Sequence, residues 1–325
     1  MPCAIFPAIR CGHPQVTLAI WGARLLVMLC ATATAQPADG PQPPAAARPN
    51  AALPEGTTAL RDVAYVTHGH ARQQLDLFIP PGATNPLPLL IWVHGGAWRG
   101  GSKEPCPALP YLARGYAVAS INYRLSQHAL FPAQLEDCKA AIRWLRAHAQ
   151  AHGIDPERFA VWGASAGGHL VALLGTTGDI RQFDVGENLT VSSRVQAVVD
   201  FFGPTDFTRM QQHSPPNSPI NHDAPDAPEA KLIGGAVQEN QDKAAAANPI
   251  TYVTTDDAPF LILHGSQDNV VPHQQSELLR DALQKAGVPV TLKIVAGAGH
   301  GFGGREIDRQ VADFLDRHCK PAAMP

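Results

Sequence analysis

Short, nearly continuous apolar runs alternate with segments of helical periodicity along most of the chain. Continuous rather than alternating apolarity is typical of strands that are buried on both faces. The runs therefore predict an α/β fold in which a mostly parallel central sheet is flanked by helices. Six runs carry the pattern, at 87–96, 116–125, 159–165, 195–203, 259–265 and 290–297.

Helical patterns lie between and after these runs. Residues 131–153 carry an apolar stripe, with Pro132 near its start and Gly153 at its end. The stripe consists of Leu135, Cys138, Ile142, Leu145 and Ala149. Residues 276–287 and 305–318 predict two further helices, and 61–67 with 73–82 predict an antiparallel hairpin that leads into the sheet.

The alternation breaks between about residues 205 and 257, which are polar, rich in proline and poorly periodic. A long irregular insertion in a compact domain is more often a binding loop or lid than an element of the fold. This segment is therefore expected to be a short, lid-like insertion within one catalytic domain that spans 57–325.

The N-terminal residues differ in composition from the rest. Residues 1–35 contain no acidic residue and carry a short apolar stretch that ends in small residues, which is typical of a secretory signal peptide cleaved after Ala35. The stretch is too short for a permanent membrane span, so stable membrane insertion is not expected. Residues 36–56, rich in proline and alanine, are expected to be a linker. The mature protein is expected to be secreted or periplasmic.

Charge and cysteine content limit the possible partners and the number of disulfides. With a formal net charge of −3 and 16% charged residues, the chain lacks the basic character of nucleic-acid-binding proteins. Cys106, Cys138 and Cys319 follow the leader, so at most one internal disulfide is possible among them. Cys106 with Cys138 is one candidate pair, but we favour a buried position for Cys138 on its helix. The sequence does not indicate an oligomeric state.

The stretch "GASAGGHL" carries the first candidate chemistry. Its Gly163-Ala164-Ser165-Ala166-Gly167 matches G-x-S-x-G, the strained strand-to-helix turn that exposes a nucleophilic serine. The apolar strand before it and a helix over about 168–175 supply the expected context. The alternative is a serine that only caps the helix.

A serine hydroxyl needs a histidine to accept its proton and an acid to orient that histidine. In a fold of this kind the acid and then the histidine follow the serine along the chain, at later strand ends. Asp268 follows the run at 259–265, and His300 follows the run at 290–297. The order Ser165, Asp268, His300 therefore predicts a catalytic triad, although each residue alone is also compatible with an ordinary loop position.

The stretch "HGGAW" after the first central run resembles an oxyanion loop. The backbone N–H groups of Gly96, Ala97 and Ala166 are the expected oxyanion donors, and His94 is expected to hold the loop by hydrogen bonding. Trp98, which ends the motif, is the candidate substrate-binding residue.

Other polar residues carry no recognised cofactor chemistry. No HExxH sequence occurs, and neither a metal nor another cofactor is expected. His169 and His264 are expected to be structural, and Asp206 is expected to cap a turn.

Together these motifs resemble the α/β-hydrolase superfamily over about residues 62–318, in the esterase subgroup that includes bifunctional feruloyl and acetyl xylan esterases and hormone-sensitive-lipase-like carboxylesterases. The further motifs are "NYRLS", "FFGPTDF", "HGSQDNVVP" and "GAGHGF". The resemblance implies the α/β-hydrolase fold and ester hydrolysis without a cofactor. It also implies Ser165 as nucleophile, His300 as general base and then acid, and Asp268 as the residue that orients it.

The leading hypothesis is a secreted serine carboxylesterase that acts on small acyl or aryl esters, including acetyl or feruloyl esters of plant polysaccharide. An arylformamidase-like amidohydrolase is the enzyme alternative, because "HGGxW" also occurs there. A non-catalytic binding module on the same fold is the more distant alternative.

Overall fold

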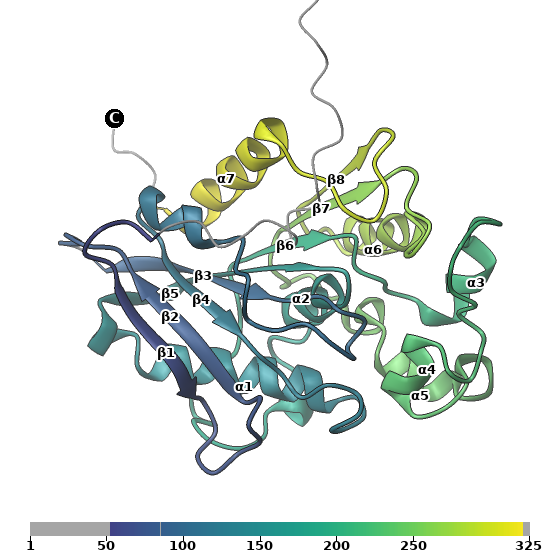
Figure 1. The fold of residues 1–325 in the computed structure, drawn as a ribbon, viewed down its shortest axis with the longest axis horizontal. Helices are drawn as coiled ribbons and strands as arrows, with labels where there is room; N and C mark the ends of the chain where they lie inside the picture. Colours follow the sequence, from purple (N-terminus) through teal and green to yellow (C-terminus); the bar gives the residue numbers. More distant parts are fainter. Residues whose placement is uncertain (1–52, 85, 321–325) are drawn as a thin grey trace, which may run out of the picture. The chain divides into compact units, whose positions relative to one another are not determined.

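A computed structural model describes residues 53–84 and 86–320, and its centre is an eight-stranded sheet with the order β1-β2-β4-β3-β5-β6-β7-β8 (Figure 1). The strands are β1 (Thr58–Ala64), β2 (Gln74–Ile79), β3 (Leu87–Val93), β4 (Ala117–Ile121), β5 (Ile154–Ala164), β6 (Ala197–Phe201), β7 (Phe260–Gly265) and β8 (Val290–Val295). Strands β3 to β8 are parallel, and β1 and β2 form the antiparallel hairpin that the sequence predicts. The predicted signal peptide and nearly all of the predicted linker lie outside the described residues.

Helices cover both faces of this sheet, as the alternating pattern predicts (Figure 1). One face packs against α1 (Ala133–Ala147), α2 (Ala166–Thr176) and α6 (Gln274–Lys285). The other face packs against the 3₁₀ helix η2 (Leu109–Arg114) and α7 (Arg305–Cys319). Two further 3₁₀ turns are η3 (Gln150–His152) and η4 (Arg181–Phe183). Within residues 53–84 and 86–320, no helix has the length and apolarity that a bilayer crossing requires.

The sheet divides the apolar core into two clusters. In β3, Leu89, Ile91 and Val93 belong to the cluster beneath α1 and α2, whereas Leu90 and Trp92 belong to the cluster beneath α7. Successive side chains of a strand point to opposite faces, so one continuous apolar run supplies both clusters.

The same division separates the two cysteines that the sequence offered as a possible pair. Cys138 is buried in the cluster beneath α1, and Cys106 is buried in the cluster on the opposite face. No disulfide joins them in the structure, and Cys138 occupies the buried helical position that we favoured.

The segment 205–257 is less irregular than its sequence suggests. It forms η5 (Phe207–Arg209), α3 (Met210–His213), α4 (Pro228–Ile233), η6 (Val237–Glu239), α5 (Gln241–Ala246) and η7 (Pro249–Tyr252). Leu232, Ile233 and Val237 are buried in the cluster beneath α1 and α2. These elements are too short to show a hydrophobic period, which explains why composition alone suggested a loop.

Candidate active site

Ser165 lies at the sharp turn between β5 and α2. Its φ of 56° and ψ of −122° fall in a region that costs a residue with a Cβ about 1–3 kcal/mol. The turn is held from both sides, because the Ser165 N–H donates to the Phe201 carbonyl (2.8 Å) and the Ser165 carbonyl accepts from the His169 N–H (3.0 Å). The backbone therefore presents the serine hydroxyl at the N-terminus of α2.

Small residues around Ser165 let three backbone segments approach one another. A Cβ on Gly167 would lie 2.1 Å from the carbonyl oxygen of Val93, and a Cβ on Gly163 would lie 2.3 Å from that of Gly167. Any larger residue would push α2 away from the end of β3. The glycines of the G-x-S-x-G motif are thus explained by backbone packing.

Ser165, His300 and Asp268 are brought together from three loops at the carboxyl edge of the sheet. His300 Nε2 lies 3.0 Å from Ser165 Oγ, and His300 Nδ1 lies 2.7 Å from Asp268 Oδ2. An ionised carboxylate can only accept hydrogen bonds, so Nδ1 carries the hydrogen and Nε2 keeps its lone pair toward the serine. This geometry lets the imidazole accept the serine proton.

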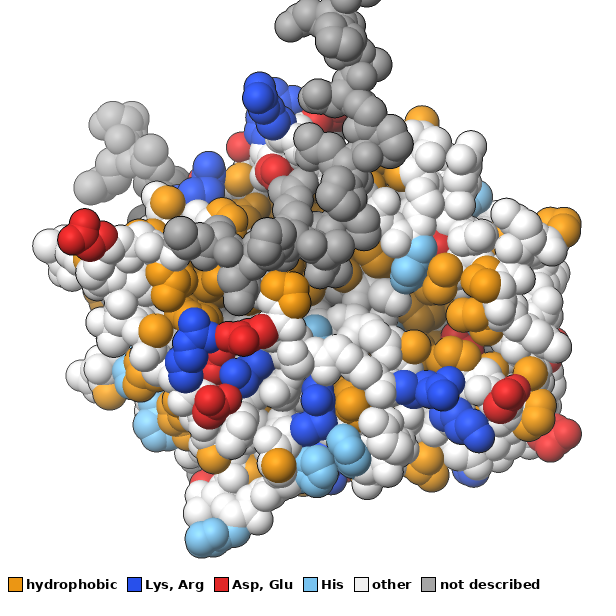
Figure 2. Space-filling view, viewed as in Figure 1, with side chains coloured by type: hydrophobic (Ala, Val, Ile, Leu, Met, Phe, Trp, Pro, Cys, Tyr) orange, Lys and Arg blue, Asp and Glu red, His pale blue; other side chains and the backbone are white. Residues whose placement is uncertain are grey.

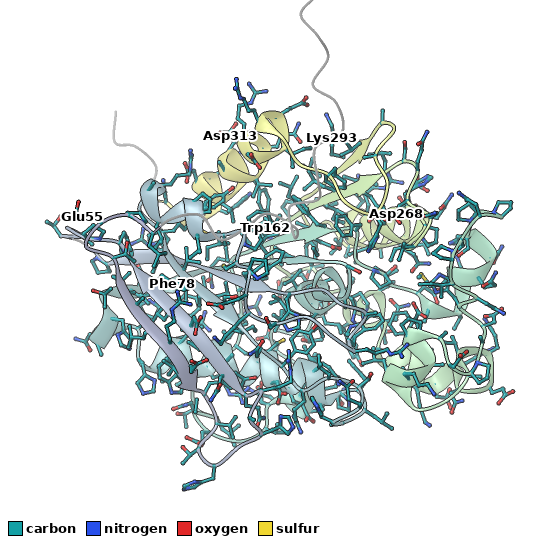
Figure 3. All side chains as sticks on the ribbon, in the orientation of Figure 1. Glu55, Phe78, Trp162, Asp268, Lys293 and Asp313 are labelled. Atoms are coloured by element: carbon teal, nitrogen blue, oxygen red, sulfur yellow. The ribbon has the colours of Figure 1, made fainter. Side chains whose placement is uncertain are left out.

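Asp268, labelled in Figure 3 in the loop that follows β7, is held in the ionised form. Its Oδ1 accepts from the N–H groups of Val270 and Val271, each at 2.9 Å. Burial opposes ionisation, but hydrogen bonds from His264 and His300 outweigh it and hold the pKa of the Asp268 carboxyl well below its usual range. The orienting group is therefore a fixed, negatively charged acceptor.

His264 has a supporting position that the sequence did not reveal. It is fully buried in β7, where its Nε2 lies 3.2 Å from Asp268 Oδ2 and its Nδ1 lies 2.7 Å from the hydroxyl of Ser276. The sequence predicted a structural role for His264 but did not predict its contact with Asp268. Its place four residues before Asp268, at the end of the same strand, is the signal that points to this contact.

Two of the three expected oxyanion donors, the N–H groups of Ala97 and Ala166, are oriented by the hydrogen bonds of the carbonyl in the same peptide unit. In a trans peptide, the C=O of one residue and the N–H of the next point in opposite directions. The Gly96 carbonyl accepts from Arg99 (2.9 Å) and Gly100 (3.0 Å), which fixes the direction of the Ala97 N–H. The bond from His169 to the Ser165 carbonyl fixes the Ala166 N–H in the same way.

These N–H groups are available to a ligand. Those of Gly96, Ala97 and Ala166 donate to no protein acceptor in the part of the chain that the structure describes. A Cβ on Gly95 would lie 2.7 Å from the Ala164 carbonyl oxygen, so this loop lies directly against the turn that carries Ser165. Preorganised backbone donors beside a nucleophile are the arrangement that stabilises an oxyanion.

A cavity of about 410 Å³ opens beside Ser165 and His300. Its apolar wall includes Trp92, Pro105 and Phe202. A volume of this size is typical of sites for small molecules. The cavity can therefore accept the acyl part of a small ester.

Ion pairs hold one side of this cavity in place. Lys103 pairs with Asp62 and Asp76, and Arg61 pairs with Asp76 and Glu104. Figure 2 shows blue and red side chains next to one another over β1 and β2. Glu104 itself lines the cavity, so the ion pairs connect the hairpin to its wall.

Trp98 lies elsewhere, which corrects its expected role in binding. It is only 2% exposed, it is not among the residues that line the cavity, and it packs edge-on against His169 and Phe207. Its left-handed backbone, with φ of 54°, directs the side chain inward rather than toward the cavity. Trp98 therefore anchors the oxyanion loop in the core.

The remaining candidates have structural positions. Asp206 accepts a hydrogen bond from the Thr208 N–H and caps η5, as expected. His169 is fully buried, where its Nε2 lies 2.7 Å from the Ala247 carbonyl oxygen. Among residues 53–84 and 86–320, no cluster of three or more His, Cys, Asp or Glu side chains could hold a metal ion.

Asp200, in β6 beneath the start of α2, leads to a prediction about pH. One carboxylate oxygen accepts from the Gly203 N–H (2.9 Å), the other has no hydrogen-bond partner among the described residues, and burial raises the pKa of this carboxyl to about 7. The folded state therefore keeps a proton that the unfolded chain loses near pH 4, so this residue destabilises the fold increasingly as pH rises toward 7. Relative to Asp200→Asn, we expect the wild type to lose roughly 2 kcal/mol of stability between pH 5 and pH 8.

Urea unfolding of both proteins at several pH values measures this difference, because contributions from all other groups cancel. A difference in stability that stays constant from pH 5 to pH 8 would contradict the prediction.

The fold and the arrangement of these residues are those of an α/β-hydrolase. The chain belongs to the BD-FAE family, whose model matches residues 75–283. The resemblance to α/β-hydrolase esterases is thereby confirmed.

Relatives of known name support the same assignment. The probable carboxylic ester hydrolase LipM of Mycobacterium tuberculosis is 34% identical over 248 residues, which cover 74% of this chain and 56% of that protein. Esterase LipC of the same organism is 34% identical over 223 residues, which cover 67% and 54%. This chain therefore spans little more than half the length of these relatives.

Solved structures with the same fold include carbohydrate esterases. A truncated form of a carbohydrate esterase from gut microbiota is 34% identical, with a TM-score of 0.74 over 81% of this chain and 97% of that one. An acetyl ester-xyloside bifunctional hydrolase from Caldicellulosiruptor lactoaceticus is 27% identical, with a TM-score of 0.61 over 75% and 85%.

Proposed function

We propose that this protein is a serine carboxylesterase, with Ser165 as nucleophile, His300 as general base and acid, and Asp268 as the residue that orients His300. The observation that carries the proposal is the continuous hydrogen-bonded chain from Ser165 Oγ through His300 to Asp268, at 3.0 and 2.7 Å. These three side chains lie beside three backbone N–H groups that have no protein acceptor among the described residues.

The reaction follows from these positions. Ser165 Oγ attacks the ester carbonyl carbon while His300 Nε2 takes the hydroxyl proton, and the carbonyl oxygen becomes an oxyanion that accepts from Gly96, Ala97 and Ala166. The intermediate collapses, and His300 returns the proton to the departing alcohol. Water then attacks the acyl-enzyme with His300 again as base, which releases the acid and regenerates Ser165. No step requires a cofactor.

The proposed substrates are small acyl or aryl esters, with acetyl or feruloyl esters of plant polysaccharide as the natural class. The cavity of about 410 Å³ beside Ser165 suits a small or flat acyl group, and its aromatic wall of Trp92 and Phe202 suits an aryl ring. The titles of the similar structures name a carbohydrate esterase and an acetyl ester-xyloside hydrolase.

Export is part of the same proposal. A polysaccharide ester is an extracellular substrate, and the composition of residues 1–35 is typical of a signal peptide. N-terminal sequencing of the protein recovered outside the cytoplasm tests the expected cleavage after Ala35.

A substrate panel tests the proposed specificity. Initial rates of the purified protein are measured on p-nitrophenyl acetate, butyrate and octanoate, methyl ferulate, acetylated xylan and N-formylkynurenine. We expect turnover of p-nitrophenyl acetate and of methyl ferulate or acetylated xylan. Selective turnover of N-formylkynurenine would instead assign the protein to the amidohydrolases, and no turnover of any ester would refute the proposal.

A further inference from the structure

The orientation of one oxyanion donor depends on a residue far from it in sequence. The N–H of Gly96 belongs to the same peptide unit as the carbonyl of Gly95, so whatever holds that carbonyl also directs the N–H. The Gly95 carbonyl oxygen lies 2.7 Å from Nδ1 of His94. For this contact to be a hydrogen bond, Nδ1 must carry the hydrogen, because a carbonyl can only accept.

A neutral imidazole has two tautomers, and only the one with the hydrogen on Nδ1 makes this bond. His94 is 4% exposed, and burial lowers its pKa to about 3, so the ring stays neutral at the pH values at which esterases are assayed. The group that faces the other ring nitrogen, Nε2, can either support this tautomer or oppose it.

Arg72, from the turn between β1 and β2, faces Nε2. Its Nη2 lies 3.1 Å from His94 Nε2 and donates to the Gly101 carbonyl (3.0 Å), while its Nε donates to the Tyr123 carbonyl (2.8 Å). A guanidinium has only donors, so Nε2 must be the acceptor in this contact. With the hydrogen on Nε2 instead, that N–H would face the Arg72 Nη2 donor, and the lone pair of Nδ1 would face the Gly95 carbonyl oxygen.

The ring has little freedom to escape this contact. It stacks on the ring of Tyr123 with centroids 4.3 Å apart, and the Tyr123 hydroxyl donates to the His94 carbonyl (2.9 Å). A Cβ on Gly101 would lie 2.7 Å from His94 Nδ1, so the backbone on that side is also in close contact. The imidazole therefore cannot rotate to exchange its nitrogens without disturbing the loop.

We propose that Arg72 is a positioning residue for the oxyanion hole: its guanidinium selects the His94 tautomer that holds the Gly95 carbonyl and thereby directs the Gly96 N–H toward the reacting oxygen. The proposal rests on the esterase function proposed above. Arg72 acts through His94 and touches neither the substrate nor the triad.

Kinetics of Arg72→Ala test this role. Removal of a whole oxyanion donor costs about 10²–10³ in kcat, so misdirection of one donor should lower kcat by about 10- to 100-fold while KM stays within about twofold. The affinity of a trifluoromethyl ketone, whose adduct with Ser165 carries an oxyanion, should fall by the same factor as kcat/KM. Arg72→Lys, which keeps a donor without an acceptor, should recover part of the loss.

Two further measurements separate positioning from general destabilisation. The effects of Arg72→Ala and His94→Ala on kcat should be far from additive, because both variants break the same series of contacts that ends at the Gly95 carbonyl. The ¹⁵N spectrum of the histidines should show His94 with a bare Nε2 in the wild type and should lose that signature in Arg72→Ala. Arg158→Ala is the control, since Arg158 also donates to backbone carbonyls, those of Pro86 and Cys319, and should keep wild-type kcat.

Unchanged kcat in Arg72→Ala, a rise in KM alone, or additive effects with His94→Ala would each overturn the inference. The wild type distinguishes this failure from failure of the proposed function. If the wild type hydrolyses no ester, the function is refuted, and the ¹⁵N tautomer of His94 still decides whether Arg72 selects it.

Discussion

Ser165→Ala is expected to lower kcat for ester hydrolysis by about 10⁵- to 10⁶-fold, with the fold retained. The variant keeps the oxyanion donors and the cavity but has no atom within reach of His300 Nε2 that can form an acyl-enzyme. Alanine also has a Cβ, so the strained backbone at φ 56° stays as it is and stability should change little. Burst kinetics with p-nitrophenyl acetate should show no acyl-enzyme in the variant.

The control for this experiment is a serine outside the site. The hydroxyl of Ser214 donates to the Met210 carbonyl at 2.8 Å, and Ser214 has no contact with the triad in the structure. Ser214→Ala should therefore retain wild-type kcat. Full activity of Ser165→Ala at unchanged circular dichroism would show that Ser165 is not the nucleophile and would overturn the proposed mechanism.

Features with a local signal were predictable from the sequence. The six parallel strands, the hairpin of β1 and β2 and the helices α1, α6 and α7 each carry a hydrophobic period or a continuous apolar run. The positions of Ser165, Asp268 and His300 followed from strand ends, because loops at the carboxyl ends of parallel strands meet at one edge of the sheet.

Features that depend on contacts between distant segments were not predictable. Arg72 meets His94 across 22 residues of sequence, and nothing in its neighbourhood marks it as different from other surface arginines. The positions of Cys106 and Cys138 on opposite faces depend on strand order, which composition does not contain. Trp98 was misassigned because its motif indicates a loop near the substrate, whereas its backbone angles decide where the side chain points.

Asp268→Asn is the second large effect that the structure predicts, and the hydrogen bonds around Asp268 determine it. Oδ1 accepts from the N–H groups of Val270 and Val271, so an asparagine must place its carbonyl oxygen there. Its NH₂ group then occupies the position of Oδ2, 2.7 Å from His300 Nδ1. A donor at this position forces Nδ1 to accept and moves the hydrogen of His300 to Nε2.

With its hydrogen on Nε2, His300 donates toward Ser165 instead of accepting the serine proton. We expect kcat to fall by about 10⁴-fold, less than for Ser165→Ala, while KM changes little because the cavity is intact. Asp206→Asn is the matched control, since Asp206 also accepts a backbone N–H, that of Thr208, through its carboxylate and asparagine can make the same cap.

Steady-state kinetics on p-nitrophenyl acetate and the ¹⁵N spectrum of His300 measure the two parts of this argument separately. A loss of less than tenfold, with the hydrogen still on Nδ1, would show that His300 does not depend on Asp268 for its tautomer. A large loss with the hydrogen moved to Nε2 would instead tie catalysis to the backbone N–H groups of Val270 and Val271, which hold the asparagine oxygen at the position of Oδ1.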